Sequence, residues 1–261
     1  MSKKIVFMGT PNFAVPILKA LLNSQFKINC VYTQPPKKSS RGQKINISPV
    51  HKFSEKNKLN VRTPASLDTK VEIEYFKSLS PYIVIVAAYG NLIPKDYLNV
   101  PEKGFLNIHA SLLPKWRGAA PIQRSIMNLD KETGISIMQI REKLDTGPYM
   151  KQIKVKIDGQ TNTKMLLDKL SILGAENIVD SIDLIQNNKA TFIEQDENKV
   201  TYAKKILKEE SRIDWNKSAE EILAKINAMN PNPGAWFEYN GSRYKIWKAL
   251  MNDQFKIPGE I

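Results

Sequence analysis

The stretch YIVIVAAYG, residues 82–90, decides the fold class, because it is a continuous apolar run with the length of one strand. Isoleucine and valine dominate it, and β-branched side chains of this kind favour extended backbone. A strand that is apolar on both faces is typical of a parallel sheet, where helices cover both faces. The run therefore predicts an inner strand of an α/β protein.

On both sides of this stretch, strand and helix patterns alternate. Ile5–Met8 is a short apolar run, the tight turn Gly9-Thr10-Pro11 follows it, and residues 15–24 are apolar at helical spacing. Alternation of this kind predicts a Rossmann-like, doubly wound, mostly parallel sheet. The other expected strands are residues 26–33, 104–110 and 134–140, and the other expected helices are residues 71–80 and 121–128.

The chain changes character near residue 190. Residues 162–188 show one long helical pattern, whereas residues 190–206 are polar and have no helical face. Residues 218–230 then predict a short helix, and residues 235–249 predict a hairpin whose turn is an Asn-Gly pair. We therefore expect two domains joined by a linker, with boundaries at 1–189, 190–208 and 209–261.

The charge balance points to a polyanionic partner. The 261 residues include 39 Lys and Arg against 26 Asp and Glu, which gives a net charge of +13 and a pI near 9.6. Basic proteins of this kind most often bind nucleic acid. Charge alone leaves open the alternative of a lysine-rich surface that is merely solvated.

Residue counts exclude several other classes of protein. The single cysteine, Cys30, rules out a disulfide framework, and no set of His, Cys, Asp and Glu has metal-ligand spacing. No apolar run reaches the roughly 18 residues of a membrane span. Gly9, Pro11 and Asn12 interrupt the apolar N-terminus too early for a signal peptide. The sequence predicts a cytoplasmic protein without a metal.

Two polar residues mark the end of one expected strand. In GFLNIHA, Asn107 and His109 alternate, so both side chains lie on the same side near the carboxyl end of the strand. Open α/β sheets bind ligands outside the carboxyl ends of their strands. The pair is therefore a candidate reactive site, although a lone histidine is more often a satisfied core residue.

A carboxylate further along the chain strengthens the catalytic interpretation. Asp145 lies in the loop REKLDTGP, directly after the strand expected at residues 134–140. Together with Asn107 and His109 it would suit acyl-type transfer, with an amide for the oxyanion, an imidazole for the proton and a carboxylate to orient the imidazole. No Ser or Cys is coupled to the histidine, which favours direct attack by a substrate amine. Gly9 alone is weak evidence for dinucleotide binding.

The same residues carry a family resemblance. The segments NIHASLLPKWRGAAPIQRSI, GISIMQIREKLDTG and VFMGTPNFAVPILKAL resemble the methionyl-tRNA formyltransferases, within the 10-formyltetrahydrofolate-dependent transferases, over essentially the whole chain. The resemblance implies an enzyme of one-carbon metabolism and translation initiation. It would move a formyl group from the co-substrate 10-formyltetrahydrofolate to the methionyl amine of initiator methionyl-tRNA. We expect a monomer that has no contact with membranes.

The resemblance also implies the nature of each domain. Residues 1–189 correspond to the formyltransferase catalytic domain. Residues 209–261 correspond to the start of a small OB-like β-barrel that binds tRNA. The family's barrel continues past the equivalent of Ile261, so we expect this one to be truncated.

Residue roles follow from the resemblance position by position. Asn107, His109 and Asp145 are implied to be catalytic, with Asn107 polarising the formyl carbonyl, His109 assisting proton transfer and Asp145 ordering His109. The implied tRNA contacts lie in an inserted basic loop, residues 33–50, with Arg41 joined by Lys37, Lys38 and Lys44. Implied to bind folate are Ser111, Leu112, Leu113 and Pro114, and, around the pterin, Ala87, Ala88, Tyr89, Gly90, Leu92 and Ile93.

Two alternatives stay open at this point. One keeps the chemistry and changes the acceptor to a small-molecule amine, such as a sugar nucleotide or glycinamide ribonucleotide. The other is a shortened, inactive relative that binds RNA. The basic loop at residues 33–50 counts against a small acceptor.

Overall fold

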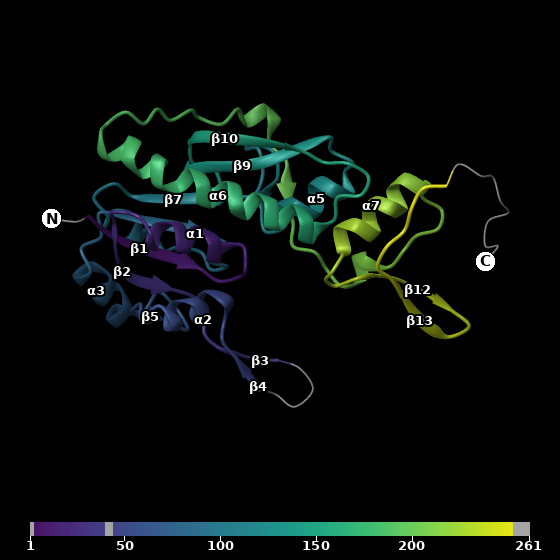
Figure 1. Cartoon of the computed structure of the whole chain (residues 1–261), viewed down its shortest axis with the longest axis horizontal. Helices are drawn as coiled ribbons and strands as arrows, with labels where there is room; N and C mark the ends of the chain where they lie inside the picture. The colour runs from purple at the N-terminus through teal and green to yellow at the C-terminus, as the bar shows by residue number, and fades with distance from the viewer. Residues whose placement is uncertain (1–2, 40–43, 253–261) are drawn as a thin grey trace.

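A seven-stranded sheet forms the centre of the part of the chain described by the computed structural model, residues 3–39 and 44–252 (Figure 1). The strand order is β10-β9-β7-β6-β1-β2-β5. The strands are β1 (Lys4–Gly9), β2 (Lys27–Tyr32), β5 (Val61–Arg62), β6 (Ile83–Ala87), β7 (Phe105–His109), β9 (Glu132–Gln139) and β10 (Tyr149–Lys156).

Strand direction confirms the mostly parallel sheet. The strands from β7 through β6, β1 and β2 to β5 are all parallel to their neighbours. The exceptions are β9, which pairs antiparallel with β7, and β10, which pairs antiparallel with β9. The stretch that predicted an inner strand is β6, which lies between β1 and β7 and is buried throughout.

Helices cover both faces of the sheet. Ile5 and Phe7 of β1 point into one apolar cluster, and Val6 and Met8 point into the other, as the alternation of a strand requires. The first cluster includes residues of α1 (Ala14–Leu22), α2 (Pro49–Lys56), α5 (Pro121–Met127) and α6 (Thr163–Gln186), and the second includes residues of α3 (Lys70–Ser78) and α4 (Lys95–Leu98).

The segment expected to be a linker lies against the part of the chain that forms the large sheet. Its strand β11 (Tyr202–Ala203) pairs in parallel with β8 (Arg117–Gly118), and Ile193 forms a bridge with Tyr149. Two 3-10 turns, η1 (Glu197–Lys199) and η2 (Glu209–Ser211), flank β11. We call residues 193–203 the strap. Its role as a boundary between domains stays a prediction.

A small C-terminal unit follows the strap, with its own apolar cluster around Ile213, Ile226 and Met229. Helix α7 (Ala219–Met229) begins with the capping box expected of this sequence, in which Ser218 and Glu221 bond each other's backbone N–H. The hairpin of β12 (Ala235–Tyr239) and β13 (Ser242–Ile246) confirms the second prediction. That this unit is the start of an OB-like barrel stays a prediction.

A two-stranded arm, β3 (Lys37–Ser39) and β4 (Lys44–Asn46), projects from the sheet between β2 and α2 (Figure 1). It corresponds to the inserted basic loop. No helix in the described ranges is long and apolar enough to cross a membrane.

Candidate active site

The chain reverses its order across the sheet next to β1, where β2 and β5 lie on one side and β6 and β7 on the other. Ligands of open α/β sheets bind outside the carboxyl ends of the strands at such a switch point. A cavity of about 560 Å³ opens there, within the range of small-molecule sites. Its walls come from the segments that follow β1, β6 and β7 and from the loop between β9 and β10.

The candidate pair on β7 faces this cavity. Asn107 and His109 both line it, two residues apart on one side of the strand as predicted. The side-chain amide of Asn107 has no hydrogen-bond partner among the residues that the structure describes. Its two N–H groups are therefore available to an oxygen of a bound molecule.

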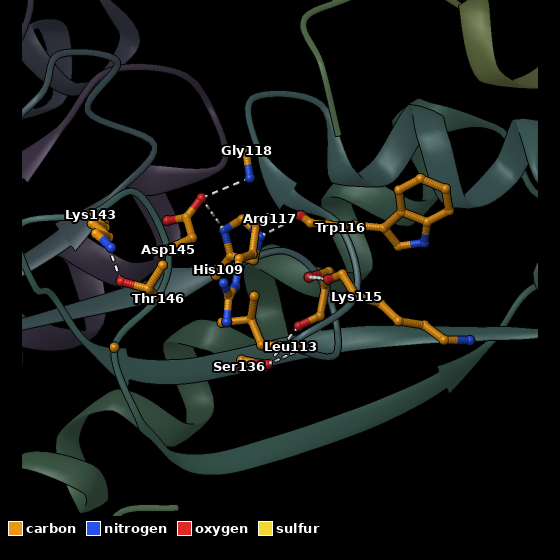
Figure 2. A network of polar contacts seen from close by, with 12 residues as sticks. His109, Leu113, Lys115, Trp116, Arg117, Gly118, Ser136, Lys143, Asp145 and Thr146 are labelled. Atoms are coloured by element: carbon orange, nitrogen blue, oxygen red, sulfur yellow. Dashed lines mark hydrogen bonds and ion pairs between the residues drawn. The ribbon is translucent and has the colours of Figure 1, made fainter. Parts of the chain in front are cut away.

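Bonding at one ring nitrogen fixes the tautomer of His109, which is only 6% exposed (Figure 2). Nε2 lies 2.9 Å from the carbonyl oxygen of Trp116. Because a carbonyl can only accept, Nε2 must carry a hydrogen. The other nitrogen, Nδ1, is therefore the atom that gains or loses a proton.

Asp145 completes the arrangement, and Figure 2 shows its carboxylate between the ring of His109 and the backbone of Gly118. Its Oδ2 lies 3.7 Å from Nδ1 of His109 and accepts a hydrogen bond of 2.8 Å from the Gly118 N–H. The 3.7 Å separation is an ion-pair distance and too long for a hydrogen bond. A protonated Nδ1 is therefore stabilised by the carboxylate.

The backbone at this site is held in a sparsely populated conformation. Asp145, Trp116 and Ala88 all have positive φ, of 52°, 63° and 48°. Left-handed backbone at non-glycine residues is uncommon and clusters at functional sites. Two of these three residues contribute the groups that surround the His109 ring.

Polar side chains of the strap, the buried Gln195 and the exposed Glu197, hold the loops around His109. Arg117, 1% exposed, donates through Nε to Gln195 and through both terminal nitrogens to the Glu197 carboxylate. Gln195 in turn donates to the backbone carbonyls of Asp145 and Gly147. The strap therefore joins the loop after β7 to the loop after β9.

The charges in this network support each other. Burial works against the Arg117 charge, but the hydrogen bonds with Glu197 outweigh it, so the pKa of Arg117 lies above its ordinary value. The same bonds hold the pKa of Glu197 below its ordinary value. Sequence reasoning missed Arg117, Gln195 and Glu197, because a polar segment without periodicity carries no local sign that it packs against a distant loop.

Most residues expected around the pterin line the cavity: Ala88, Tyr89, Gly90, Leu92 and Ile93. They follow β6, and burial raises the pKa of the Tyr89 phenol to about 12. Ala87 is fully buried at the end of β6, and it is not part of the cavity wall.

The residues Ser111 to Pro114 lie outside the cavity wall. The Ser111 hydroxyl donates to the Lys115 carbonyl, and the Leu113 N–H donates to the Ser136 hydroxyl, so these residues shape the loop that carries Trp116. Leu112 and Pro114 are half-buried beside them. Direct contact of these four residues with a folate stays a prediction.

The expected tRNA contacts fall on the arm. Lys37 is exposed in β3, and its Nζ donates to Gln34. For Lys38 and Lys44 the structure describes the backbone of β3 and β4, and Arg41 lies outside the described residues. Among the described residues, no group of three or more His, Cys, Asp or Glu is placed to hold a metal ion.

Comparisons with known sequences agree with this site. Residues 3–182 match the formyl transferase family, and residues 205–261 match the formyl transferase C-terminal domain. A methionyl-tRNA formyltransferase of Pelagibacter ubique is 56% identical over 262 residues, covering 100% of this chain and 84% of the relative. Another, from Coxiella burnetii, is 45% identical, covering 97% of this chain and 81% of the relative.

Solved structures share the fold. An N-formyltransferase from Helicobacter canadensis, in complex with folinic acid and dTDP-3-aminofucose, has a TM-score of 0.75 at 21% identity, covering 98% of this chain and 90% of that one. A 4-N formyltransferase from Francisella tularensis also has a TM-score of 0.75 at 21% identity, covering 96% and 98%. The sequence matches span both halves of the molecule. The chain belongs to the formyl transferase family.

Proposed function

We propose that the chain transfers a formyl group from 10-formyltetrahydrofolate to the free amino group of initiator methionyl-tRNA, for the initiation of translation. Its relatives at 56% and 45% identity carry the name methionyl-tRNA formyltransferase. One structural observation carries the proposal: an unpartnered amide, Asn107, lies next to a histidine and aspartate pair on the wall of an open cavity.

The co-substrate would enter the cavity between the segments after β6 and β7. Residues Ala88 to Ile93 supply apolar side chains and backbone groups suited to a flat pterin ring. The formyl group would then lie against Asn107 and His109. No step of this chemistry requires a metal.

The acceptor would approach the open side of the cavity. We assign the tRNA contacts to the arm, through Arg41, Lys37, Lys38 and Lys44, and to the C-terminal unit. Lysine and arginine neutralise phosphates, and the net charge of +13 favours such a polyanion. We further propose that residues 1–189 hold the catalytic machinery, that 190–208 connect it to residues 209–261, and that the enzyme acts as a cytoplasmic monomer.

Transfer begins when the neutral methionyl amine attacks the formyl carbon and the carbonyl electrons move to oxygen. The Asn107 N–H donates to that developing oxyanion. The attacking nitrogen loses a proton, N10 of the folate gains one, and the bond from carbon to N10 breaks. The formyl group ends on the methionyl nitrogen, and tetrahydrofolate leaves.

His109 and Asp145 would assist the transfer of the proton from the attacking amine. Nε2 is held by the Trp116 carbonyl, so Nδ1 is the atom that can take a proton from the amine and return it. The Asp145 carboxylate, 3.7 Å away, stabilises the imidazolium while it exists. The same positive charge favours the oxyanion on the formyl group.

An acceptor assay tests the proposal. The purified chain is given 10-formyltetrahydrofolate with methionyl-tRNA, a dTDP-amino sugar or glycinamide ribonucleotide, and the formylated product is measured. We expect product with initiator methionyl-tRNA and none with the other two. Product with a small amine alone would replace the proposal by a small-molecule formyltransferase, and no product with any acceptor, despite RNA binding, would indicate an inactive relative.

A further inference from the structure

Gln195 of the strap makes an unusually complete set of hydrogen bonds for a side chain remote in sequence from the site. The residue is only 8% exposed. Its Nε2 donates to the carbonyl of Asp145 at 2.8 Å and to the carbonyl of Gly147 at 2.7 Å. Its Oε1 accepts from Nε of Arg117 at 2.9 Å. Both donor hydrogens and one acceptor site are therefore in use.

The first two bonds act on the turn that carries Asp145. That residue has a φ of +52°, in the left-handed region that is uncommon for residues other than glycine, although aspartate enters it more readily than most. The turn must also double back, because β9 runs antiparallel to β7 and its carboxyl end points away from His109. A double donor that binds two carbonyls of this turn fixes the direction in which the Asp145 carboxylate points.

The third bond acts on the opposite side of His109. Arg117 lies between Trp116, whose carbonyl accepts from Nε2, and Gly118, whose N–H donates to Asp145. The backbone of these residues is also tied to the strap, because the Trp116 and Arg117 N–H groups donate to the hydroxyl and the carbonyl of Thr201. Gln195 thus contacts both loops whose groups surround the His109 ring.

We propose that Gln195 is a positioning residue for formyl transfer, which sets the Asp145 carboxylate against Nδ1 of His109. This inference rests on the proposed function of His109 and Asp145. Gln195 touches neither the cavity nor His109 and acts through the backbone of Asp145. The strap that carries it leads directly into the C-terminal unit, so the polar segment between the two matched domains is part of the active-site support.

Substitution of Gln195 by glutamate separates its bonds to the Asp145 turn from its bond to Arg117. In Gln195→Glu a carboxylate still accepts from Arg117, but it cannot donate, and its charge faces the carbonyls of Asp145 and Gly147. The matched control is Glu197→Gln, which weakens the other partner of Arg117 and leaves both bonds to the Asp145 turn in place. Loss of hydrogen bonds that orient metal-binding side chains typically costs 10- to 100-fold in activity, and we expect an effect of the same order here.

The experiment measures formylation of methionyl-tRNA by both variants, with kcat and both KM values. We expect Gln195→Glu to lower kcat roughly 10- to 100-fold with the KM for the folate within about twofold, and Glu197→Gln to stay within about threefold. A Gln195→Glu enzyme with native kcat would overturn the proposal. If Gln195→Glu does not fold, Gln195→Asn, neutral and one methylene shorter, replaces it.

A double-mutant cycle shows whether Gln195 acts through Asp145. In an Asp145→Ala background we expect Gln195→Glu to cost no more than about twofold, because the group that it positions is gone. Effects that multiply would mean a general structural role and would overturn the inference. Asn107→Ala and His109→Ala are assayed in parallel. Native rates in both of these variants would contradict the proposed function of the site. A native rate in Gln195→Glu, together with low rates in Asn107→Ala and His109→Ala, would contradict only the inference about Gln195.

A spectroscopic readout gives a direct view of the ring. The chain has two histidines, so ¹⁵N-histidine labelling yields one imidazole from the site and one from His51, assigned with His51→Gln. We expect Gln195→Glu to change the Nδ1 and Nε2 shifts of His109 and to leave those of His51 in place. Unchanged shifts for His109 would contradict positioning, even if kcat falls.

Discussion

At His109 the two ring nitrogens have different partners, so only one of them, Nδ1, faces a charged group. Nε2 faces the Trp116 carbonyl at 2.9 Å, and Nδ1 faces the Asp145 carboxylate at 3.7 Å. A buried neutral histidine that donated to a backbone carbonyl at one nitrogen and accepted from a backbone N–H at the other would be a plain structural residue. Here a carboxylate lies 3.7 Å from Nδ1, and the side-chain amide of Asn107, two residues away, has no hydrogen-bond partner among the described residues. These contacts favour a catalytic role for His109 over that of a satisfied core histidine.

The charge of Asp145 is testable without changing its shape. Asp145→Asn keeps an oxygen for the Gly118 N–H but removes the charge that stabilises the imidazolium. We expect kcat to fall roughly 10²-fold, as for loss of acid–base assistance. Steady-state formylation kinetics measure this, and a native kcat would count against the assigned role.

Among the elements, the pairing of β8 with β11 matters most for the site, because it brings the strap against the loop after β7. The two strands come from segments far apart in the chain and make a short parallel ladder. Gly118 allows this pairing of β8 with β11. Its φ is +118°, and a Cβ there would meet the Ala203 carbonyl oxygen at 2.8 Å. The strand pair is thus limited to a residue without a side chain at this position.

Gly118→Ala should separate the strap from the loop. We expect the free energy of unfolding to fall by about 1–3 kcal/mol from backbone strain alone, with a further loss from the clash, and kcat to fall with it. Gly104→Ala is the matched control, because its φ is +70° but no atom lies within 4 Å of an added Cβ. Urea unfolding and formylation assays compare the two. Equal stability and equal activity in both variants would contradict the importance of the strand pair.

The sequence alone predicted the parts of this site that depend on the alternation of side chains along a strand. Asn107 and His109 share a side of β7 because strand side chains alternate, and β7 is parallel to β6, so its carboxyl end is at the ligand-binding edge. Residues 88–93, most of which were expected there from the family resemblance and not from the strand period, also line the cavity. Asp145 was predicted at the right place, although its strand, β9, runs antiparallel to β7 and the loop must return.

What could not be predicted depends on contacts between distant segments. The turn at Asp145 is held by Gln195, which lies fifty residues further along the chain. The strap is polar because its side chains satisfy buried groups such as Arg117, yet a polar segment with no period has the composition of a linker. Composition cannot distinguish a side chain bonded to water from one bonded to a buried guanidinium.

The whole molecule joins an α/β half to a small C-terminal unit through more than one connection. Besides the strap, Arg124 of α5 forms an ion pair with Glu210 and donates to the carbonyl of Lys204. These contacts lie between the segments that match the two formyl transferase domains. A molecule with a net charge of +13 and such connections is suited to hold a large polyanion across both parts.

The ion pair gives this connection a pH dependence. The hydrogen bonds from Arg124 hold the pKa of Glu210 below its ordinary value of 4.5. A depressed pKa means that the unfolded chain binds the proton more readily. The pair therefore stabilises the fold above about pH 4.5, and this contribution is lost as the pH falls through the lower, folded value.

Glu210→Gln should remove that contribution. Both side chains are partly exposed, so we expect a loss of about 1 kcal/mol or less at pH 7, and a smaller loss at pH 3, below the ordinary pKa of the carboxyl. Denaturant unfolding at the two pH values measures it. Glu209→Gln is the control, because its carboxylate makes no ion pair among the described residues. A Glu210→Gln deficit that is the same at both pH values would show that the charge is not the cause.

The most direct test of the account is the single-turnover rate of methionyl-tRNA formylation by Asn107→Ala. Removing one oxyanion donor typically lowers the chemical rate about 10²–10³-fold, and we predict a loss in that range with folate binding retained. Asn128→Ala is the control, since Asn128 is exposed outside the cavity wall and its amide donates to Asp130, and its rate should stay within about threefold of native. A native rate for Asn107→Ala would contradict the proposed chemistry at this site.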